Sequence, residues 1–273
     1  MFLPSAPKSN TQSLFSTLEL IFHVAVRDIR MANSNAVVGL VVNVLQSSMM
    51  LATFYFIFYV LGFRGSAVRG DYMLYMMSGI FMYMTHVKTV RAVSKAEGPT
   101  SAMMKHAPMN TVVAIGGQAL AALYQQVLSC LVILFLYNTL FARIEIEFPV
   151  AAFGMLLLAW ITGIGVGMIF KAAMPWAPDF FRVAMTVYTT VNMIASGKMF
   201  LANALPTSIM FWFSWNPLFH LIDQTRGFVF LNYSPHYTSV SYAAIVGAVL
   251  IFFGLLGDTF TRQYASASWS AGK

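Results

Sequence analysis

The sequence has little charge and almost no cysteine. Only 9% of its 273 residues are Asp, Glu, Lys or Arg, whereas roughly 25% is usual in a soluble domain. The single cysteine, Cys130, excludes an intramolecular disulfide and a multi-cysteine metal site. The five histidines fall in loops or at the ends of apolar stretches, without His-x-x-x-His or Glu-x-x-His pairing. We therefore expect no metal site.

Motifs for catalysis and nucleotide binding are also missing. There is no Gly-x-Ser-x-Gly nucleophile motif. The only approach to a phosphate-binding loop, Ser196-Gly197-Lys198-Met199, has the wrong neighbours. None of the nine acidic residues falls near the middle of an apolar stretch, where a proton-coupled carrier normally places one. We expect neither enzyme activity nor a cofactor in this chain.

What the sequence does contain is six long apolar stretches. Hydrophobic residues make up 59% of the chain, and a helix needs about 20 mostly apolar residues to cross a bilayer. We predict an all-α integral membrane protein with a single transmembrane domain over residues 14–262. In the fourth stretch, Ala159, Gly163 and Gly167 recur at four-residue steps, which favours close helix packing. The predicted spans are residues 36–61, 72–89, 112–140, 149–170, 183–205 and 240–260.

The distribution of positive charge predicts the orientation. With the N-terminus inside, eleven of the 16 Lys and Arg residues lie on the cytoplasmic side and five outside, as the positive-inside rule requires. We expect a protein of the bacterial inner membrane with both termini in the cytoplasm. The net charge of +7 is a topology signal, because the basic residues form no dense patch, and nucleic-acid binding is not expected.

The ends of the chain are polar. Residues 1–13 are expected to be disordered, without a cleavable signal, and residues 263–273 to form a cytoplasmic tail. Residues 14–30 have apolar and charged side chains on opposite helical faces, which predicts an interfacial amphipathic helix. A soluble docking helix is the alternative. The apolar face holds Leu14, Leu18, Ile21, Phe22, Ala25 and Ile29.

The predicted outer segment, residues 205–239, is unusually apolar. Asn216-Pro217 divides it into two halves that are each too short to cross, which predicts two short re-entrant helices before the last span. Asp223 and Arg226 are three residues apart and can pair on one helix face. Lys198, near the outer end of span five, is expected to snorkel to the interface. The residues assigned to the outer helices are Trp212, Trp215, Asn216, Pro217, Asp223 and Arg226.

Uncharged polar side chains recur along three predicted spans, at helical spacing in the first, third and fifth. Hydroxyl and amide groups can exchange hydrogen bonds with glycan hydroxyls, and aromatic rings can stack on sugars. The alternative is that these groups hold helices together within the bundle. The candidate substrate conduit comprises Asn43, Gln46, Ser47, Phe54, Tyr55, Tyr59, Gln125, Thr189, Asn192 and Ser196.

Several short motifs accompany this order of amphipathic helix, spans and short outer helices. They are Arg27-Asp28-Ile29 with Gly39, Met77-Ser78-Gly79, Ser196-Gly197 followed by Leu205-Pro206, and Trp215-Asn216-Pro217-Leu218-Phe219-His220 with Arg226-Gly227. Together they resemble the ABC-2 type permeases, and most closely the inner-membrane permease subunits of capsular polysaccharide exporters. The resemblance covers residues 14–262. The chain departs from the usual pattern at Gly39, which is followed by Leu40-Val41 where relatives often carry tryptophan.

The resemblance implies a permease homodimer bound to two copies of a separate ABC ATPase, which would hold the ATP and Mg. It implies export of a lipid-linked acidic or neutral polysaccharide, which periplasmic and outer-membrane export proteins would take onward. Export of O-antigen-like glycan, lipid or drug is the alternative within the fold. A channel, a secondary carrier and an intramembrane enzyme are the alternatives outside it. The same resemblance implies that the residues that couple the permease to the ATPase are Glu97, Gly98, Pro99, Lys105, His106, Pro108, Met109, Arg27 and Arg30.

Overall fold

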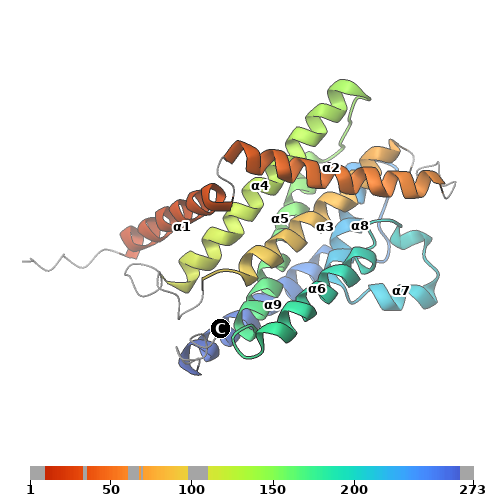
Figure 1. Cartoon of the computed structure of the whole chain (residues 1–273). Helices are drawn as coiled ribbons and strands as arrows, with labels where there is room; N and C mark the ends of the chain where they lie inside the picture. Colours follow the sequence, from red (N-terminus) through yellow and green to blue (C-terminus); the bar gives the residue numbers. More distant parts are fainter. Residues whose placement is uncertain (1–9, 33–35, 61–67, 69, 98–109, 265–273) are drawn as a thin grey trace, which may run out of the picture.

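The computed structural model describes residues 10–32, 36–60, 68, 70–97 and 110–264, and its regular elements in these ranges are all helical (Figure 1). Helix α5 lies between α3 and α9, while α2 crosses the outside of α3 and α4. A short 3-10 helix, Ala202–Ala204, follows α6. The α-helices are α1 (Asn10–Ala32), α2 (Ala36–Val60), α3 (Tyr72–Ser94), α4 (Thr111–Leu140), α5 (Pro149–Ala173), α6 (Pro178–Ala195), α7 (Thr207–Phe213), α8 (Pro217–Val229) and α9 (Val240–Tyr264).

Four helices in the described ranges are long and apolar enough to cross a membrane. They cover Val37–Val60, Thr111–Leu140, Pro149–Ala173 and Val240–Tyr264, and they make the chain a multi-pass membrane protein. The two other predicted spans correspond to α3 and α6, which contain more polar residues. Helix α3 contains two basic residues in its second half, and α6 begins with an acidic and a basic residue in its first two turns.

Small residues bring α5 against α3, as their spacing predicts. A Cβ at Gly163 would lie 2.8 Å from the backbone oxygen of His86, and one at Gly167 would lie 2.8 Å from the Cβ of Val93. Ala159, one turn before Gly163, is fully buried. Because any larger side chain would separate the two helix backbones, these positions set the α3–α5 distance.

The C-terminal ends of α5 and α9 are joined by buried polar contacts. Lys171 Nζ lies 2.6 Å from Asp258 Oδ1, and both side chains are largely buried. Arg262 Nε lies 3.2 Å from the other carboxylate oxygen of Asp258. The indole of Trp176 donates a hydrogen bond to the Thr261 hydroxyl. The two helices are thus held together at this end by paired charge as well as by apolar packing.

The amphipathic helix is α1, and it lies against α4. Val24 and Ala25 are buried, and Val24 covers Gly117 of α4. Other apolar residues of α1, such as Leu18 and Phe22, remain more than half exposed, so this helix keeps a free apolar face. The helix begins at Asn10, so residues 10–13 are helical and not part of a disordered terminus.

The predicted fifth span, residues 183–205, is wrong at both ends. Helix α6 begins at Pro178, a proline suited to the first helical turn. It ends at Ala195, ten residues before the predicted end, because Gly197 adopts a left-handed conformation with φ 69°. The turn after α6 is held by Arg226, whose guanidinium donates hydrogen bonds to the carbonyl oxygens of Gly197, Lys198 and Phe200.

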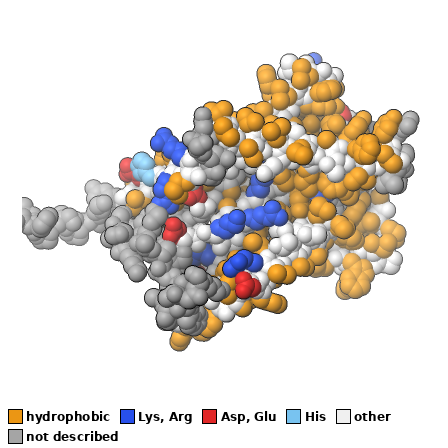
Figure 2. Space-filling view, in the orientation of Figure 1, with side chains coloured by type: hydrophobic (Ala, Val, Ile, Leu, Met, Phe, Trp, Pro, Cys, Tyr) orange, Lys and Arg blue, Asp and Glu red, His pale blue; other side chains and the backbone are white. Residues whose placement is uncertain are grey.

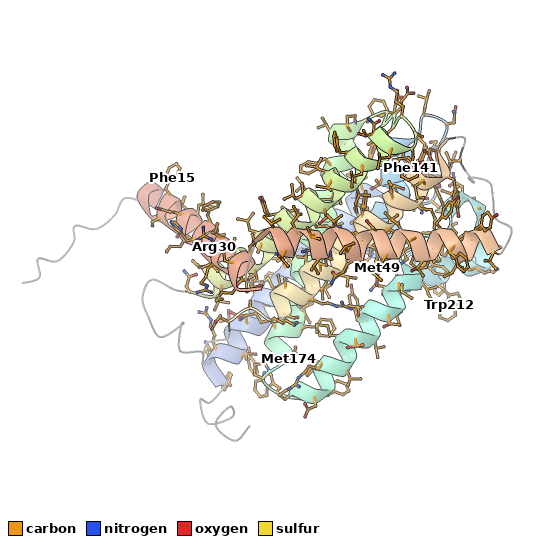
Figure 3. All side chains as sticks on the ribbon, turned by 45° about the horizontal axis from the view of Figure 1, so that its top comes forward. Phe15, Arg30, Met49, Phe141, Met174 and Trp212 are labelled. Carbon is orange, nitrogen blue, oxygen red and sulfur yellow. The ribbon has the colours of Figure 1, made fainter. Side chains whose placement is uncertain are left out.

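The two short helices predicted before the last span are present as α7 and α8. The Asn216 side chain accepts a hydrogen bond from the Leu218 amide and caps α8. Helix α8 is a core element, since Leu218, Leu221 and Ile222 are almost wholly buried. Helix α7 is the opposite, with Trp212 70% exposed and directed away from the bundle (Figure 3).

Candidate functional site

A polar cavity of about 230 Å³ lies between the first four helices. Three of its lining residues, Asn43, Gln46 and Gln125, belong to the predicted conduit. Figure 2 shows Lys and Arg side chains gathered across the middle of the molecule, between the positions of α2 and α6. The full lining is Asp28, Asn43, Gln46, Lys88, Arg91, Ala92, Gln118, Ala121, Ala122 and Gln125.

Hydrogen bonds join the walls of this cavity. Lys88 Nζ donates to Asn43 Oδ1 over 2.7 Å, and Asn43 Nδ2 donates to Gln125 Oε1 over 3.2 Å. The chain of contacts therefore links α3, α2 and α4. Sequence reasoning placed Lys88 and Arg91 at a span end and missed them as cavity residues. Their three-residue spacing on a helix, which directs both toward one side, was the available signal.

One rim of the cavity brings α1 close to the end of α3. Burial raises the pKa of Asp28, the neighbouring Arg27 guanidinium opposes the rise, and Glu97 adds to it. Arg27 and Glu97, two of the predicted ATPase-coupling residues, thus act on the charge of Asp28, which lines the cavity, whereas Arg30 is exposed. The remaining coupling residues lie outside the described ranges: Gly98, Pro99, Lys105, His106, Pro108 and Met109.

Helix α6 contacts α3 mainly through polar groups. The Thr189 backbone oxygen accepts a hydrogen bond from the Tyr83 hydroxyl, and the Thr189 hydroxyl accepts one from Arg91. His86 is fully buried and lies 2.8 Å from the Tyr188 hydroxyl, which corrects its expected place at a span end. Most apolar side chains of α6 remain exposed.

The polar residues farther along α6 also make helix contacts. Asn192 accepts a hydrogen bond from Asn216 at the start of α8, over 2.8 Å. Ser196 is fully buried at the C-terminal cap of the helix. Asn192 and Thr189 thus join helices, as the alternative interpretation of the polar stripes expects.

Lys198 is buried inside the bundle, so the prediction that it snorkels is wrong. Its side chain is 1% exposed. Nζ lies 3.9 Å from the ring centroid of Tyr83 and 4.2 Å from that of Phe54. Among the described residues it has no hydrogen-bond partner. The left-handed turn at Gly197 changes the chain direction after α6.

Arg226 and Asp223 do not pair, so that prediction is also wrong. Arg226 stacks over Tyr75, 4.2 Å from its ring centroid, and binds the turn after α6. Asp223 accepts hydrogen bonds from the hydroxyls of Tyr233, over 2.6 Å, and Thr238, over 2.9 Å. Burial, with the Asp223 carboxylate, holds the pKa of Tyr233 well above its usual range. Each charge has its own set of partners because the two residues face different segments.

Three of the motifs behind the resemblance meet at Arg226. A Cβ at Gly79 would lie 2.7 Å from the Lys198 backbone oxygen and 3.0 Å from the Arg226 guanidinium. A Cβ at Gly197 would lie 2.4 Å from the Phe219 ring. The motifs are separated in sequence, but they make one tightly packed joint between α3, the turn after α6, and α8.

The remaining predicted site residues are divided between interior and surface. Phe54 and Ser47 are buried, the latter fully, while Tyr55 and Tyr59 are 42% and 51% exposed on α2. Trp215 is 60% exposed. The structure therefore brings only part of the conduit set together.

A second cavity, of about 430 Å³, lies between α3, α4, α5 and α8 and is almost wholly apolar. Representative lining residues are Phe81, Leu134, Leu156 and Val229. Among the described residues, no group of three His, Cys, Asp or Glu side chains could hold a metal ion.

No protein-family model matches the chain. Two curated proteins are similar, and both are polysialic acid transport proteins KpsM of Escherichia coli, 30% and 29% identical over 112 residues. Each match covers 40% of this chain, which spans 43% of the length of these relatives. The chain is thus distantly homologous to a polysaccharide transport protein, which confirms the resemblance found in the sequence.

Proposed function

We propose that this chain is the membrane-spanning permease subunit of an ATP-driven exporter that moves lipid-linked capsular polysaccharide from the cytoplasm to the periplasm. The observation that carries the proposal is the distant homology to KpsM. The several membrane-crossing helices and the polar cavity with three conduit residues agree with it. The amides of Asn43, Gln46 and Gln125 can exchange hydrogen bonds with sugar hydroxyls.

In this proposal α3 and α6 also cross the membrane, which gives six spans with both termini in the cytoplasm. Arg30 and Met174 lie toward one end of the bundle, and Phe141 and Trp212 toward the other (Figure 3). Basic residues are concentrated at the first end, including Lys171 and Arg262 at the C-terminal ends of α5 and α9. That end is cytoplasmic under the positive-inside rule, and α7 and α8 are re-entrant helices on the periplasmic side.

The motor is a separate ABC ATPase present in two copies, which holds ATP and Mg, and the permease works as a homodimer. The proximity of Arg27, Asp28 and Glu97 supports a coupling route. Motion imposed on α1 or on the chain after α3 would reach the cavity wall directly. The apolar side chains of α2 and α6 that face outward supply surface for lipid and for a second copy. Periplasmic and outer-membrane proteins receive the product.

A secondary carrier is the second candidate function, because Lys198 and His86 are both buried in the bundle. Ionisable residues at such positions are a feature of ion-coupled transport. Within the same fold, export of an O-antigen-like glycan, a lipid or a drug is the alternative, and the apolar cavity favours a lipid among these.

Deletion of the gene, with complementation, tests the proposal. We expect loss of surface polysaccharide and its accumulation in the cytoplasm, both reversed by a plasmid copy. A lipopolysaccharide gel of the same strains serves as the control for the O-antigen alternative. Unchanged surface polysaccharide in the deletion strain would contradict the proposed function.

A further inference from the structure

Lys198 has a buried amine whose position is fixed by the backbone turn that carries it. The left-handed Gly197 and the Arg226 hydrogen bonds define the turn, and Gly79 leaves room for the Lys198 carbonyl. The Lys198 amine lies over two aromatic rings, those of Phe54 and Tyr83. Several contacts thus hold the turn, while its amine has no hydrogen-bond partner in the part of the chain that the structure describes.

Two buried serine hydroxyls, one on α2 and one at the end of α6, also have no hydrogen-bond partner among the described residues. They are the Oγ atoms of Ser47 and Ser196. Ser47 precedes Phe54 by two turns on one face of α2, and Ser196 precedes Lys198 by two residues. Buried polar groups without partners are uncommon, and they need a specific explanation.

A continuous set of contacts links Lys198 to the polar cavity. The Tyr83 ring contacts the ammonium, and the Tyr83 hydroxyl donates to the backbone of Thr189. The Thr189 hydroxyl accepts a hydrogen bond from Arg91, which lines the cavity beside Lys88. Tyr83 and Lys88 are five residues apart on α3, a rise of about 7.5 Å. Tyr83 and Thr189 therefore connect Lys198 to Arg91 at the cavity wall.

We propose that Lys198 is an interior binding site for an anionic group, a carboxylate or phosphate, of the transported substrate. The inference rests on the proposed function and adds to it that the substrate is acidic at the point where it passes Lys198. The group comes from either of two sources, an acidic sugar or the phosphate of a lipid linker. A neutral sugar would leave the ammonium without a counter-ion, whereas an anion supplies one.

Phe54 of α2 lies over the ammonium, so an anion that approaches from the side of α2 must displace this ring. Phe54 closes one side of the ammonium from α2, while Tyr83 is held from the other side by its hydrogen bond to α6. A shift of α2 would uncover the ammonium on the helix face that also carries Asn43, Gln46 and Ser47, and the hydrogen bonds of Arg226 would still hold the turn.

The test measures binding to the full-length chain in lipid nanodiscs. The probes are oligosialic acid, its carboxyl-reduced neutral form, and phosphatidic acid in phosphatidylcholine vesicles. We expect Lys198→Met and Lys198→Gln to weaken binding of at least one anionic probe tenfold or more, and Lys198→Arg to weaken it less than threefold. The exposed Lys95→Met is the matched control and should bind like the unmodified chain. The probe that loses affinity identifies the source of the anion.

Equal affinity of the unmodified chain and both neutral Lys198 variants for both anionic probes would overturn the site. The site would also be overturned if the carboxyl-reduced glycan binds as tightly as oligosialic acid and the binding of phosphatidic acid does not depend on Lys198. Thermal unfolding of each variant identifies any that is misfolded. If one of the two neutral variants, Lys198→Met or Lys198→Gln, is misfolded, the binding measured for the other decides the test. If Lys198 does not bind the anion, the gene deletion still abolishes surface polysaccharide. If the proposed function is wrong, the deletion has no such effect, and the affinities of the unmodified chain and the Lys198 variants alone decide whether the site exists.

Discussion

At the scale of single residues, Arg226 has the largest structural role at the joint between α3, α6 and α8. It is fully buried, stacks on Tyr75, and supplies donors to three carbonyl oxygens of the turn after α6. Those carbonyls have left the helical hydrogen-bond ladder and need donors from elsewhere. A guanidinium fits this role because its several N–H groups point in fixed directions.

Arg226→Met should therefore destabilise the protein by about 3 kcal/mol or more, because it leaves buried carbonyl groups without donors. Thermal unfolding of detergent-purified protein measures the effect. The exposed Arg182, paired with Asp179 at 3.4 Å on the surface of α6, gives the control variant Arg182→Met, which should change stability little. Equal melting temperatures for the two variants would show that the turn does not depend on Arg226.

At the level of residues, the sequence predicted which polar side chains face inward only in part. Three of the predicted conduit residues, Asn43, Gln46 and Gln125, line one cavity, and the other seven do not. The directions of Lys198 and Asp223 depend on the turn at Gly197 and on Tyr233 and Thr238, which approach from other segments. Hydropathy along one helix contains no information about such partners.

At the scale of elements, the helices differ in how they are held. Helices α3, α5 and α9 pack through glycines and buried apolar groups, while α6 is attached largely by hydrogen bonds with Tyr83, His86, Arg91 and Asn216. An element with few buried apolar contacts opens at lower free energy than the core. We therefore expect α6 to move more readily than α5.

Gly163→Ala tests the α3–α5 contact. The added Cβ would lie 2.8 Å from the His86 carbonyl, and relief of that overlap should cost about 1–3 kcal/mol. Gly154, on the same helix, has no atom within 4 Å of an added Cβ. Gly154→Ala should be neutral or stabilising by up to about 1 kcal/mol. The comparison uses thermal unfolding, and an equal effect of the two substitutions would contradict the packing described for α5.

The Lys171–Asp258 pair provides a second test at this scale. Lys171→Met should destabilise by about 3 kcal/mol, because Asp258 remains largely buried and, among the described residues, keeps only the ion pair with Arg262. Adding Asp258→Leu should restore much of the loss, since no buried charge is then left unpaired on α9. Unfolding by denaturant in detergent measures both variants. A double variant no more stable than the single one would mean that the pair is not the source of the effect.

Helix existence was predictable from apolar length, and helix ends were not. The N-terminal boundaries of α5 and α9 agree with the apolar runs at Pro149 and Val240. The end of α6 does not, because Gly197 and Arg226 stop the helix inside an apolar run. Composition does not distinguish a continued span from an apolar turn that is capped by another helix.

At the scale of the whole molecule, the proposed topology places the ends of the bundle on opposite sides of the membrane. Cysteine labelling in cells tests this. Cys130 is buried, so the unmodified chain should not react with a membrane-impermeant maleimide. Ala142→Cys, in the exposed segment after α4, should react from outside. Gln263→Cys, exposed near the end of α9, should react only after permeabilisation. Reversed labelling of these two positions would contradict the orientation.

The all-helical membrane architecture could be predicted because it depends on apolar length and charge bias, which are local properties of the chain. The polar cavity could be predicted only in part, since it is built from four helices and includes Lys88 and Arg91 from a span end. The joint at Arg226 unites Gly79 with Lys198 across more than a hundred residues. Its motifs were visible in the sequence, but their meeting point depends on tertiary structure.

The most direct test of the central claim uses inverted membrane vesicles that contain this chain together with its partner ATPase. Lipid-linked polysaccharide presented on the outside should become protected from an added glycosidase only when ATP and Mg are supplied. Dissipation of ion gradients with ionophores should leave that protection unchanged. Protection that needs a gradient but not ATP would contradict the account and assign the chain to secondary transport.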